Sequence, residues 1–295
     1  GVHVSSGTFN MYGGRISGNV SKDTSDGGGG GVYVCNSSTF NMSGNAAVSG
    51  NTAQYGSGVY LSSNSTFTMS EHAAISGNSA AMTGGGVFVS SGSITMSSDA
   101  AISGNSAGNN GGGIYISYPG TFTMENGTIS GNSADKNGGG VYVHNSGAFT
   151  MNSGSISGNR ATQNGGGVYV ENIGTAFTMK DGTIGGSTAA DANAAKYGGG
   201  VYVKNGTFTM SGGKVTGNSA TKGGGGVRLD KGTFNMSGSA VISRNTADGY
   251  GGGVDANNGT FTMSGGSITG NTTTGDDANF CGGGGVDVYN GGSFT

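Results

Sequence analysis

The stretch 138–161, GGGVYVHNSGAFTMNSGSISGNRA, holds one full copy of the motif that decides the fold. A glycine run leads into Val-x-Val, then Phe-x-Met, then Ile-Ser-Gly-Asn, after which the next glycine run begins. The first aliphatic residue after the glycines recurs at intervals of 26 to 33 residues, at Val2, Val32, Val59, Val87, Ile114, Val141, Val168, Val201, Val227, Val254 and Val286. Such a period marks stacked repeats, none of which can bury its apolar face alone.

The composition excludes several other classes of protein. Glycine supplies 68 of the 295 residues and charged residues only 9%, a balance that without periodicity would be typical of a disordered chain. The single proline, Pro119, and the missing Gly-X-Y triplet exclude collagen. A net charge of −3 without a basic stripe argues against a nucleic-acid partner, and no apolar stretch is long enough to span a membrane.

Each motif copy holds three short segments separated by turn residues. Val141-Tyr142-Val143 and Phe149-Thr150-Met151 alternate with period two, and a third segment surrounds Ile156, so all three are expected to be strands. Three strands per coil of about 27 residues predict an all-β, right-handed parallel β-helix of about ten to eleven coils. We expect residues 1–295 to form one continuous β-solenoid that is an excerpt of a longer repeat protein.

Inward positions of such a coil stack on copies of themselves. One predicted column is Phe9, Phe40, Phe67, Ile94, Phe122, Phe149, Phe177, Phe208, Phe234, Phe261 and Phe294, and the Phe-x-Met methionines form a second. We interpret the methionines as core filler rather than as a path for soft metals. The asparagines of Ser-Gly-Asn are expected to form an amide ladder that is broken at Ser187.

The pairing of a Gly-Gly-aliphatic turn with an aliphatic-x-x-Asn turn, as in 75–87, resembles the GGAI and FxxN repeats of chlamydial polymorphic membrane proteins. Similar repeats occur in large surface-exposed or secreted proteins of other bacteria. The likeness spans the chain. This chain differs from those repeats in having Gly in place of Ala, Ile or Val in place of Phe, and an inserted Phe-x-Met strand. It implies a β-helical passenger with adhesin-like roles at the bacterial cell surface.

The residue between the two valines is expected to point outward. Seven aromatic side chains in register would make a stripe on the surface, a candidate binding site: Tyr33, Tyr60, Phe88, Tyr115, Tyr142, Tyr169 and Tyr202. The alternative is a self-stacking ladder that only stiffens the sheet. Under the binding interpretation, replacement of Tyr115, Tyr142 and Tyr169 by Ser lowers binding without unfolding the rod.

The second segment offers a different surface. Triplets such as Thr121-Phe122-Thr123 place paired threonines on a flat face, which resembles the Thr-x-Thr surface of ice-binding solenoids, although Asn10, Asn41, Asn235, Ala148 and Ala176 interrupt it. Exposed strands favour threonine in any case. Ice binding is therefore an alternative to a glycan-binding face.

An enzyme is the third class, because polysaccharide lyases and pectin hydrolases use this fold. The best carboxylate pair is Asp255 above Asp287, with Arg228, Asp230 and Lys204 on neighbouring coils. Opposite charges on adjacent strands more often form a solvated ladder. His3, His72 and His144 fall in separate coils, so we expect no catalytic site, no metal site and no cofactor.

Coil length varies between the asparagine and the next glycine run, with long excursions at 20–31, 188–200 and 272–285. Solvated loops are the expected interpretation, and partner contacts are the alternative. Cys35 and Cys281 lie nine coils apart, roughly 43 Å by strand spacing, so they cannot pair within one rod and are free or intermolecular.

The sequence thus predicts a structural or adhesive shaft of a bacterial cell-surface or secreted protein, or the body of an extracellular fibre. The expected partners are other protein chains or a host or glycan surface.

Overall fold

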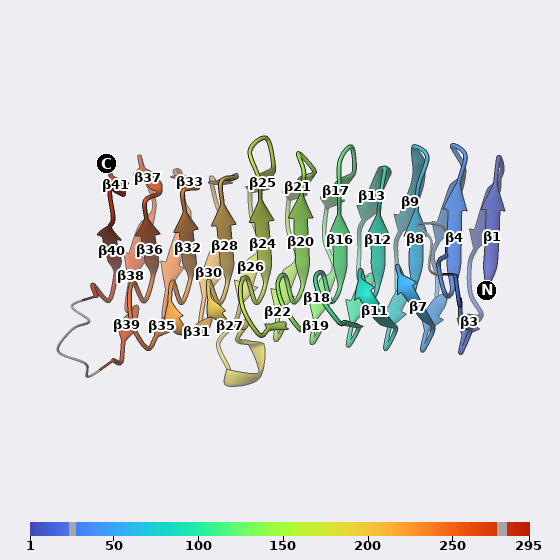
Figure 1. Ribbon diagram of the computed structural model, residues 1–295, viewed down its shortest axis with the longest axis horizontal. Helices are drawn as coiled ribbons and strands as arrows, with labels where there is room; N and C mark the ends of the chain where they lie inside the picture. The colour runs from blue at the N-terminus through green and yellow to red at the C-terminus, as the bar shows by residue number, and fades with distance from the viewer. Residues whose placement is uncertain (24–27, 276–281) are drawn as a thin grey trace.

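The computed structural model describes residues 1–23, 28–275 and 282–295. The chain winds into a right-handed parallel β-solenoid in which each motif copy makes one coil of a straight rod (Figure 1). The expected fold class is confirmed. The coils, however, supply strands to four parallel sheets, named A to D below, where the sequence predicted three strands per coil.

Sheets A and B carry the two segments with the clearest alternation. Sheet A, which faces the viewer in Figure 1, contains β1 (Val2–Ser5), β4 (Val32–Cys35), β8 (Val59–Leu61), β12 (Val87–Val89), β16 (Ile114–Ile116), β20 (Val141–His144), β24 (Val168–Glu171), β28 (Val201–Lys204), β32 (Val227–Asp230), β36 (Val254–Asn257) and β40 (Val286–Tyr289). Sheet B contains β2 (Thr8–Met11), β5 (Thr39–Met42), β9 (Ser65–Met69), β13 (Gly92–Met96), β17 (Thr121–Met124), β21 (Ala148–Met151), β25 (Ala176–Met179), β29 (Thr207–Met210), β33 (Thr233–Met236), β37 (Thr260–Met263) and β41 (Ser293–Phe294).

Sheets C and D flank the asparagine turn. Sheet C contains β3 (Arg15–Ser17), β6 (Ala47–Ser49), β10 (Ala74–Ser76), β14 (Ala101–Ser103), β18 (Thr128–Ser130), β22 (Ser155–Ser157), β26 (Thr183–Gly185), β30 (Lys214–Thr216), β34 (Val241–Ser243) and β38 (Ser267–Thr269). Sheet D contains β7 (Thr52–Tyr55), β11 (Ser79–Thr83), β15 (Ser106–Ala107), β19 (Ser133–Ala134), β23 (Arg160–Ala161), β27 (Ala194–Tyr197), β31 (Ser219–Gly223), β35 (Thr246–Ala247) and β39 (Thr272–Thr273). Several strands of sheet D are only two residues long, too short for an alternation signal in the sequence.

The core is a set of identical side chains stacked along the axis. Phe149 lies in register between Phe122 and Phe177, and the stacked Phe rings of this column have centroids 4.7 to 5.1 Å apart. Ile94 takes the predicted exceptional place opposite Phe67 and Phe122. The methionine column is buried from Met11 to Met236. Full burial of each large apolar side chain stabilises the stack by about 1.5–3 kcal/mol.

The asparagine ladder is continuous where the sequence predicted a break. Asn159 Nδ2 donates to Asn193 Oδ1 at 2.9 Å, and Asn193 Nδ2 donates to Asn218 Oδ1 at 2.9 Å. Asn193 follows the short 3₁₀ helix η1 (Ala189–Asp191), so the long excursion of this coil returns an amide to the place that Ser187 leaves empty. The expected interruption at Ser187 is therefore wrong, because six extra residues restore the register of the amides instead of forming only a solvated loop.

Candidate functional site

The predicted aromatic stripe lies on the outer face of sheet A, but it is not a surface stripe. Tyr60, Tyr142, Tyr169 and Tyr202 are buried, and the remaining members are half-buried. Successive rings stack from Tyr60 to Tyr202 with centroids 4.9 to 5.1 Å apart. The expectation of an exposed stripe is thus wrong, and the column has the geometry of the self-stacking ladder; whether Tyr33, Phe88 and Tyr115 also bind a partner stays a prediction.

Glycine turns explain why these rings are buried. The turn before each strand of sheet A folds against the base of the outward ring, so that a Cβ added at Gly138 would lie 2.7 Å from Tyr142 Cβ. The φ angle of Gly138 is +65°, a conformation that glycine adopts without strain. Stacking covers the ring faces, and these turns cover one edge, so little ring surface remains for solvent.

Glu171 organises the polar edge of the same ladder. It accepts hydrogen bonds from Tyr142 and Tyr169 and pairs with Lys204, whose Nζ lies 3.0 Å from Glu171 Oε1. Burial by itself would raise the pKa of Glu171, but the bonds from Tyr142 and Lys204 hold that pKa below its ordinary value. Burial lowers the pKa of the neighbouring His144 and outweighs the carboxylate. This cluster anchors the ladder and leaves the hydroxyls engaged.

Towards the C-terminal end, the outward column of sheet A changes from tyrosine to Arg228, Asp255 and Asp287. Arg228 Nη1 pairs with Asp255, and both side chains are almost fully buried. Arg228 also donates to the Tyr289 hydroxyl at 2.5 Å, and its Cζ lies 5.1 Å from the Tyr197 ring centroid and 5.5 Å from that of Tyr289. The predicted carboxylate pair therefore adjoins a buried cation held between two tyrosine rings.

The other charges considered for catalysis have partners of their own. Lys204 pairs with Glu171, and Asp230 accepts a hydrogen bond from the Tyr202 hydroxyl at 3.3 Å. His3 lies 3.3 Å from the thiol of Cys35, while His72 lies 3.8 Å from Asp99 at the surface. The structure thus brings Arg228, Asp255 and Asp287 together and keeps the histidines apart.

Burial is the main influence on the acid pair. It raises the pKa of Asp255 to about 6, although the Arg228 guanidinium opposes this shift. Burial likewise raises the pKa of Asp287 and brings the pKa of Tyr289 to about 12. Three buried atoms here, Asp255 Oδ1, Asp287 Oδ2 and Arg228 Nε, have no hydrogen-bond partner among the residues that the structure describes.

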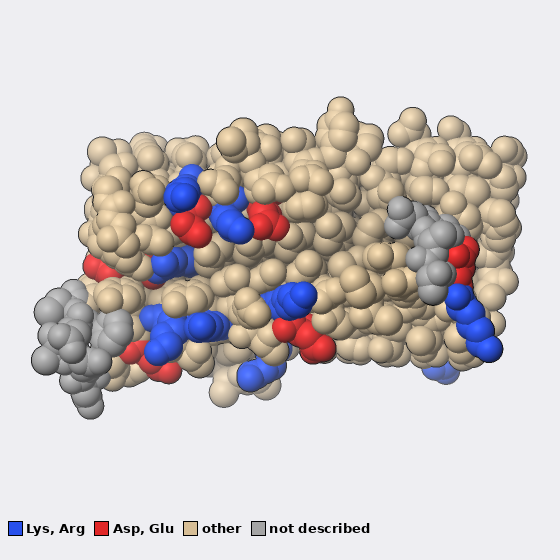
Figure 2. Space-filling model, viewed as in Figure 1, with Lys and Arg blue, Asp and Glu red and all other residues tan. Residues whose placement is uncertain are grey.

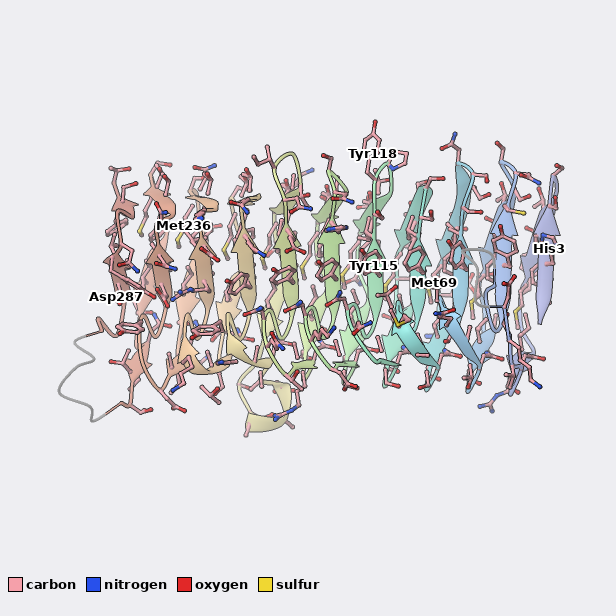
Figure 3. All side chains as sticks on the ribbon, viewed as in Figure 1. His3, Met69, Tyr115, Tyr118, Met236 and Asp287 are labelled. Carbon is pink, nitrogen blue, oxygen red and sulfur yellow. The ribbon has the colours of Figure 1, made fainter. Side chains whose placement is uncertain are left out.

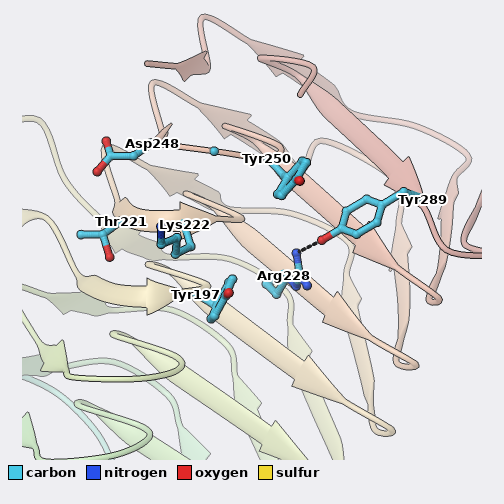
Figure 4. Close-up of a pocket in the computed structure, with 8 residues that line it drawn as sticks. Tyr197, Thr221, Lys222, Arg228, Asp248, Tyr250 and Tyr289 are labelled. Carbon is cyan, nitrogen blue, oxygen red and sulfur yellow. Dashed lines mark hydrogen bonds between the residues drawn. The ribbon is translucent and has the colours of Figure 1, made fainter. Parts of the chain in front are cut away.

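A cavity of about 270 Å³ opens beside Arg228, as Figure 4 shows. It is lined by Tyr197, Thr221, Lys222, Arg228, Asp248, Gly249, Tyr250 and Tyr289. In Figure 4 the rings of Tyr197 and Tyr289 lie on opposite sides of Arg228, and Lys222 and Asp248 lie farther out. Figure 2 shows that charged side chains of both signs gather over this C-terminal half of the face.

Sequence reasoning missed most residues of this cavity. Tyr197 and Tyr250 each stand directly before a glycine run, and Gly223 takes the corresponding place in the coil between them. A run of four glycines at 223–226, beside Tyr-Gly-Gly-Gly in the coils on either side, is the signal that could have revealed the gap.

The outer face of sheet B carries the predicted threonine pairs. Thr66 lies opposite Thr39, and Thr121 and Thr123 lie opposite Ala148 and Thr150. Thr66 and Thr121 are exposed, and the Thr66 hydroxyl donates to Thr39 Oγ1 at 3.1 Å along this face. Figure 3 places Tyr118 outside the turn between β16 and β17, away from this face.

Metal donors do not gather in the parts of the chain that the structure describes. No group of three or more His, Cys, Asp or Glu side chains lies together there. Cys35 is a buried free thiol, and Cys281 lies outside the described residues, as do Asp26, Asp276 and Asp277 of the long excursions. None of the helices among the described residues is long and apolar enough to cross a membrane.

Comparison with known proteins gives one match. A family model described as periplasmic copper-binding protein (NosD), a parallel β-helix family, matches residues 4–181, more than half of the chain. No curated protein and no solved structure matches the chain significantly. The match agrees with the β-helical part of the resemblance stated above, whereas the likeness to chlamydial repeats stays a prediction.

Proposed function

The chain belongs to the family of periplasmic copper-binding protein (NosD), and on that basis we propose that it works outside the cytoplasm as a structural and adhesive shaft. The observation that carries this proposal is that side chains of the same kind stack on one another from coil to coil along the described rod. Phe, Met, Asn and Tyr columns run in register from coil to coil, and their hydrogen bonds and ring contacts join each coil to the next. A rod built in this way is stiff and presents the same outward groups many times.

Copper, named in the family description, does not fit the donors that the described residues of this chain present. Copper(I) prefers thiolate, thioether and imidazole ligands. The thioethers of the Phe-x-Met column from Met11 to Met236 lie in the core, where an added cation would have no counter-charge and would be strongly disfavoured. Met82 lies outside this column, and its Sδ accepts a hydrogen bond from Asn109 Nδ2 at 3.2 Å. His3 and Cys35 are two neighbouring donors, and among the described residues no larger group forms around them. The shaft proposal therefore involves no copper.

Adhesion is assigned to the hydroxyl face of sheet B, because the aromatic ladder is buried. Exposed threonines such as Thr66 and Thr121 recur along this flat surface, two strands apart with Ser93 between them, at a strand spacing of about 4.8 Å. Hydroxyl groups both donate and accept hydrogen bonds, so this face suits the hydroxyls of a polysaccharide. Each contact is weak, and repetition along the rod supplies avidity.

The adhesive role is tested by sedimentation of the chain with an insoluble glycan, for which chitin and peptidoglycan sacculi are suitable. We expect the wild type to pellet and the double variant Thr121→Val, Thr123→Val to bind at least threefold less, because valine keeps the shape but removes the hydroxyls. The matched control is Ser130→Ala, Ser157→Ala on sheet C, which should bind like the wild type. If the wild type stays in solution with both glycans, or the valine variant binds fully, the adhesive face is wrong.

Ice binding is the second candidate, and the same paired threonines favour it. A thermal-hysteresis measurement on the chain decides between the two candidates. Hysteresis that disappears in the valine variant would replace the glycan proposal with the ice-binding one.

We also propose that the chain is not an enzyme. Asp255, the better placed of the two candidate carboxylates, is fully buried and held by Arg228 instead of facing a cleft. Cleavage of a polyuronide by the wild type but not by Asp255→Asn would overturn this proposal.

A further inference from the structure

We propose that the cavity beside Arg228 binds one neutral pyranose ring of a glycan. This inference goes beyond the shaft proposal, since a stiff rod with a hydroxyl face needs no cavity. It concerns a different face of the solenoid, so that the two proposals can fail separately.

Tyr197 and Tyr250 form two walls of the cavity, and the coil between them has a glycine at the corresponding position. Tyr197, Gly223 and Tyr250 occupy one position in three successive coils. Their strands are about 4.8 Å apart, so Tyr197 and Tyr250 are separated by roughly 10 Å along the axis, with no side chain between them at Gly223. Rigid tyrosine rings with polar tips suit the apolar faces and hydroxyl edges of a sugar.

Gly223 makes room for the ion pair beside the cavity. A Cβ at residue 223 would lie 2.2 Å from Asp255 Oδ2 and 3.3 Å from Arg228 Nη1, both of which belong to the buried ion pair. Any larger residue would displace that pair. The ion pair, whose Arg228 lines the cavity, therefore depends on this glycine, which explains why the repeat loses its tyrosine or asparagine at this coil.

The aromatic cage already holds its own cation. Arg228 lies over Tyr197 and Tyr289 and is neutralised by Asp255. Cation–π attraction, which would otherwise recruit an ammonium ligand, is therefore satisfied within the protein.

The outer rim supplies hydrogen-bonding groups without a net charge. Thr221, Lys222 and Asp248 are exposed at the entrance and offer a hydroxyl, an ammonium and a carboxylate. Lys222 and Asp248 have opposite charges, as Arg228 and Asp255 have below them. A neutral ligand that presents several hydroxyls fits this rim better than an anion does.

The size of the cavity restricts the ligand to one ring. A volume of about 270 Å³ falls below the roughly 300–1,000 Å³ of sites for drug-sized molecules. Its walls are held by ring contacts and the ion pair, with Tyr250 and Tyr289 centroids 5.0 Å apart, so little ordering is needed on binding.

The test is isothermal titration of the 295-residue chain with glucose, galactose and N-acetylglucosamine, beside glucuronate as an anion and choline as a cation. We expect saturable binding of at least one neutral sugar at one site, with a dissociation constant near the millimolar range. Tyr250→Ala should weaken this binding at least tenfold. Thr221→Trp, an exposed change that fills the entrance and leaves the core untouched, should weaken it equally.

The matched control is Tyr55→Ala, which removes a tyrosine from the corresponding place in a coil far from the cavity. It should bind sugar like the wild type. The proposal is overturned if none of the neutral sugars binds, if choline or glucuronate binds more tightly than all of them, or if Thr221→Trp binds as well as the wild type. Because the sheet B variant Thr121→Val, Thr123→Val leaves the cavity intact, its sugar titration should match the wild type whatever the outcome of glycan sedimentation.

Discussion

Each asparagine of the Ser-Gly-Asn motif joins three points of the rod through one side chain. Asn105 Nδ2 donates to the Ile75 carbonyl at 3.1 Å and to Asn132 Oδ1 at 3.0 Å, and its Oδ1 accepts from Asn78 Nδ2 at 2.9 Å. The side chain is fully buried, so no water replaces a lost partner.

Asn105→Ala should therefore lower the free energy of unfolding by about 3 kcal/mol, because several buried polar groups lose their partners together. Chemical denaturation followed by circular dichroism measures this change. Asn126→Ala, at an exposed turn position, is the control and should change stability by less than about 0.5 kcal/mol. Equal effects of the two substitutions would show that the ladder does not stabilise the core.

Asp255 predicts a pH dependence of stability. Burial raises its pKa in the folded chain to about 6, above the ordinary value of 3.8, so the folded state holds the proton more tightly than the unfolded state. Its contribution to stability is complete below pH 4 and is lost as the pH rises through 6. Relative to Asp255→Asn, the wild type should lose about 3 kcal/mol between pH 4 and pH 7. A difference that stays constant over this range contradicts the shift.

At the scale of the element, the outer face of sheet A is a second core. The ring of Tyr142 lies between those of Tyr115 and Tyr169, and its hydroxyl donates to Glu171. From the sequence, replacement of these tyrosines by serine was expected to leave the rod folded, because the rings were expected to lie in solvent.

Tyr142→Ser should instead lower the free energy of unfolding by about 3–5 kcal/mol, the range for loss of a large buried aromatic side chain. Tyr12→Ser is the control, since Tyr12 is 73% exposed. Thermal or chemical denaturation of both variants gives the comparison. A stable Tyr142→Ser protein would mean that the ladder contributes little to folding.

The phenylalanine ladder of sheet B has one gap, at Ile94, which is buried between Phe67 and Phe122. The turn before Ile94 has the same length as the turn between Val203 and Phe208, where phenylalanine is accommodated.

Ile94→Phe should complete the ring stack and stabilise the rod by about 0.5–1.5 kcal/mol, the usual gain for an aromatic pair. Ile94→Val is the control and should destabilise by a similar amount through lost packing. Denaturation midpoints measured side by side decide the sign. A destabilised Ile94→Phe protein would show that the local backbone cannot admit the larger ring.

At the scale of the whole molecule, burial of the methionine column predicts that the folded rod binds copper(I) weakly. The folded chain should not hold copper(I) stoichiometrically against a chelating competitor, whereas the chain in denaturant should compete better because its thioethers and thiols become accessible. A colorimetric competition assay under both conditions measures this. One tightly held copper(I) in the folded chain would overturn the conclusion that the residues do not fit the metal.

The features of the structure that the sequence predicted are those that repeat at the same place in every coil. The period of Val, Phe and Met places every side chain of these columns over its copies, so the solenoid and the core follow from spacing alone. Sheet D was missed because strands such as Ser106–Ala107 are too short to alternate. The bridging role of Asn193 was missed because its register is restored only after an irregular excursion.

The sequence alone determined the coil, its parallel strands and the residues that face the axis, because a repeated pattern constrains all coils in the same way. Only the tertiary structure decided which outward residues meet solvent. Tyr142 is buried because a glycine turn from the same coil and rings from its neighbours cover it. Arg228 forms part of the cavity wall because Gly223, between Tyr197 and Tyr250, leaves room for the pair that Arg228 makes with Asp255. Both depend on the ends of the sheet D strands and on the glycine turns that follow them, which the alternation of apolar residues does not reveal.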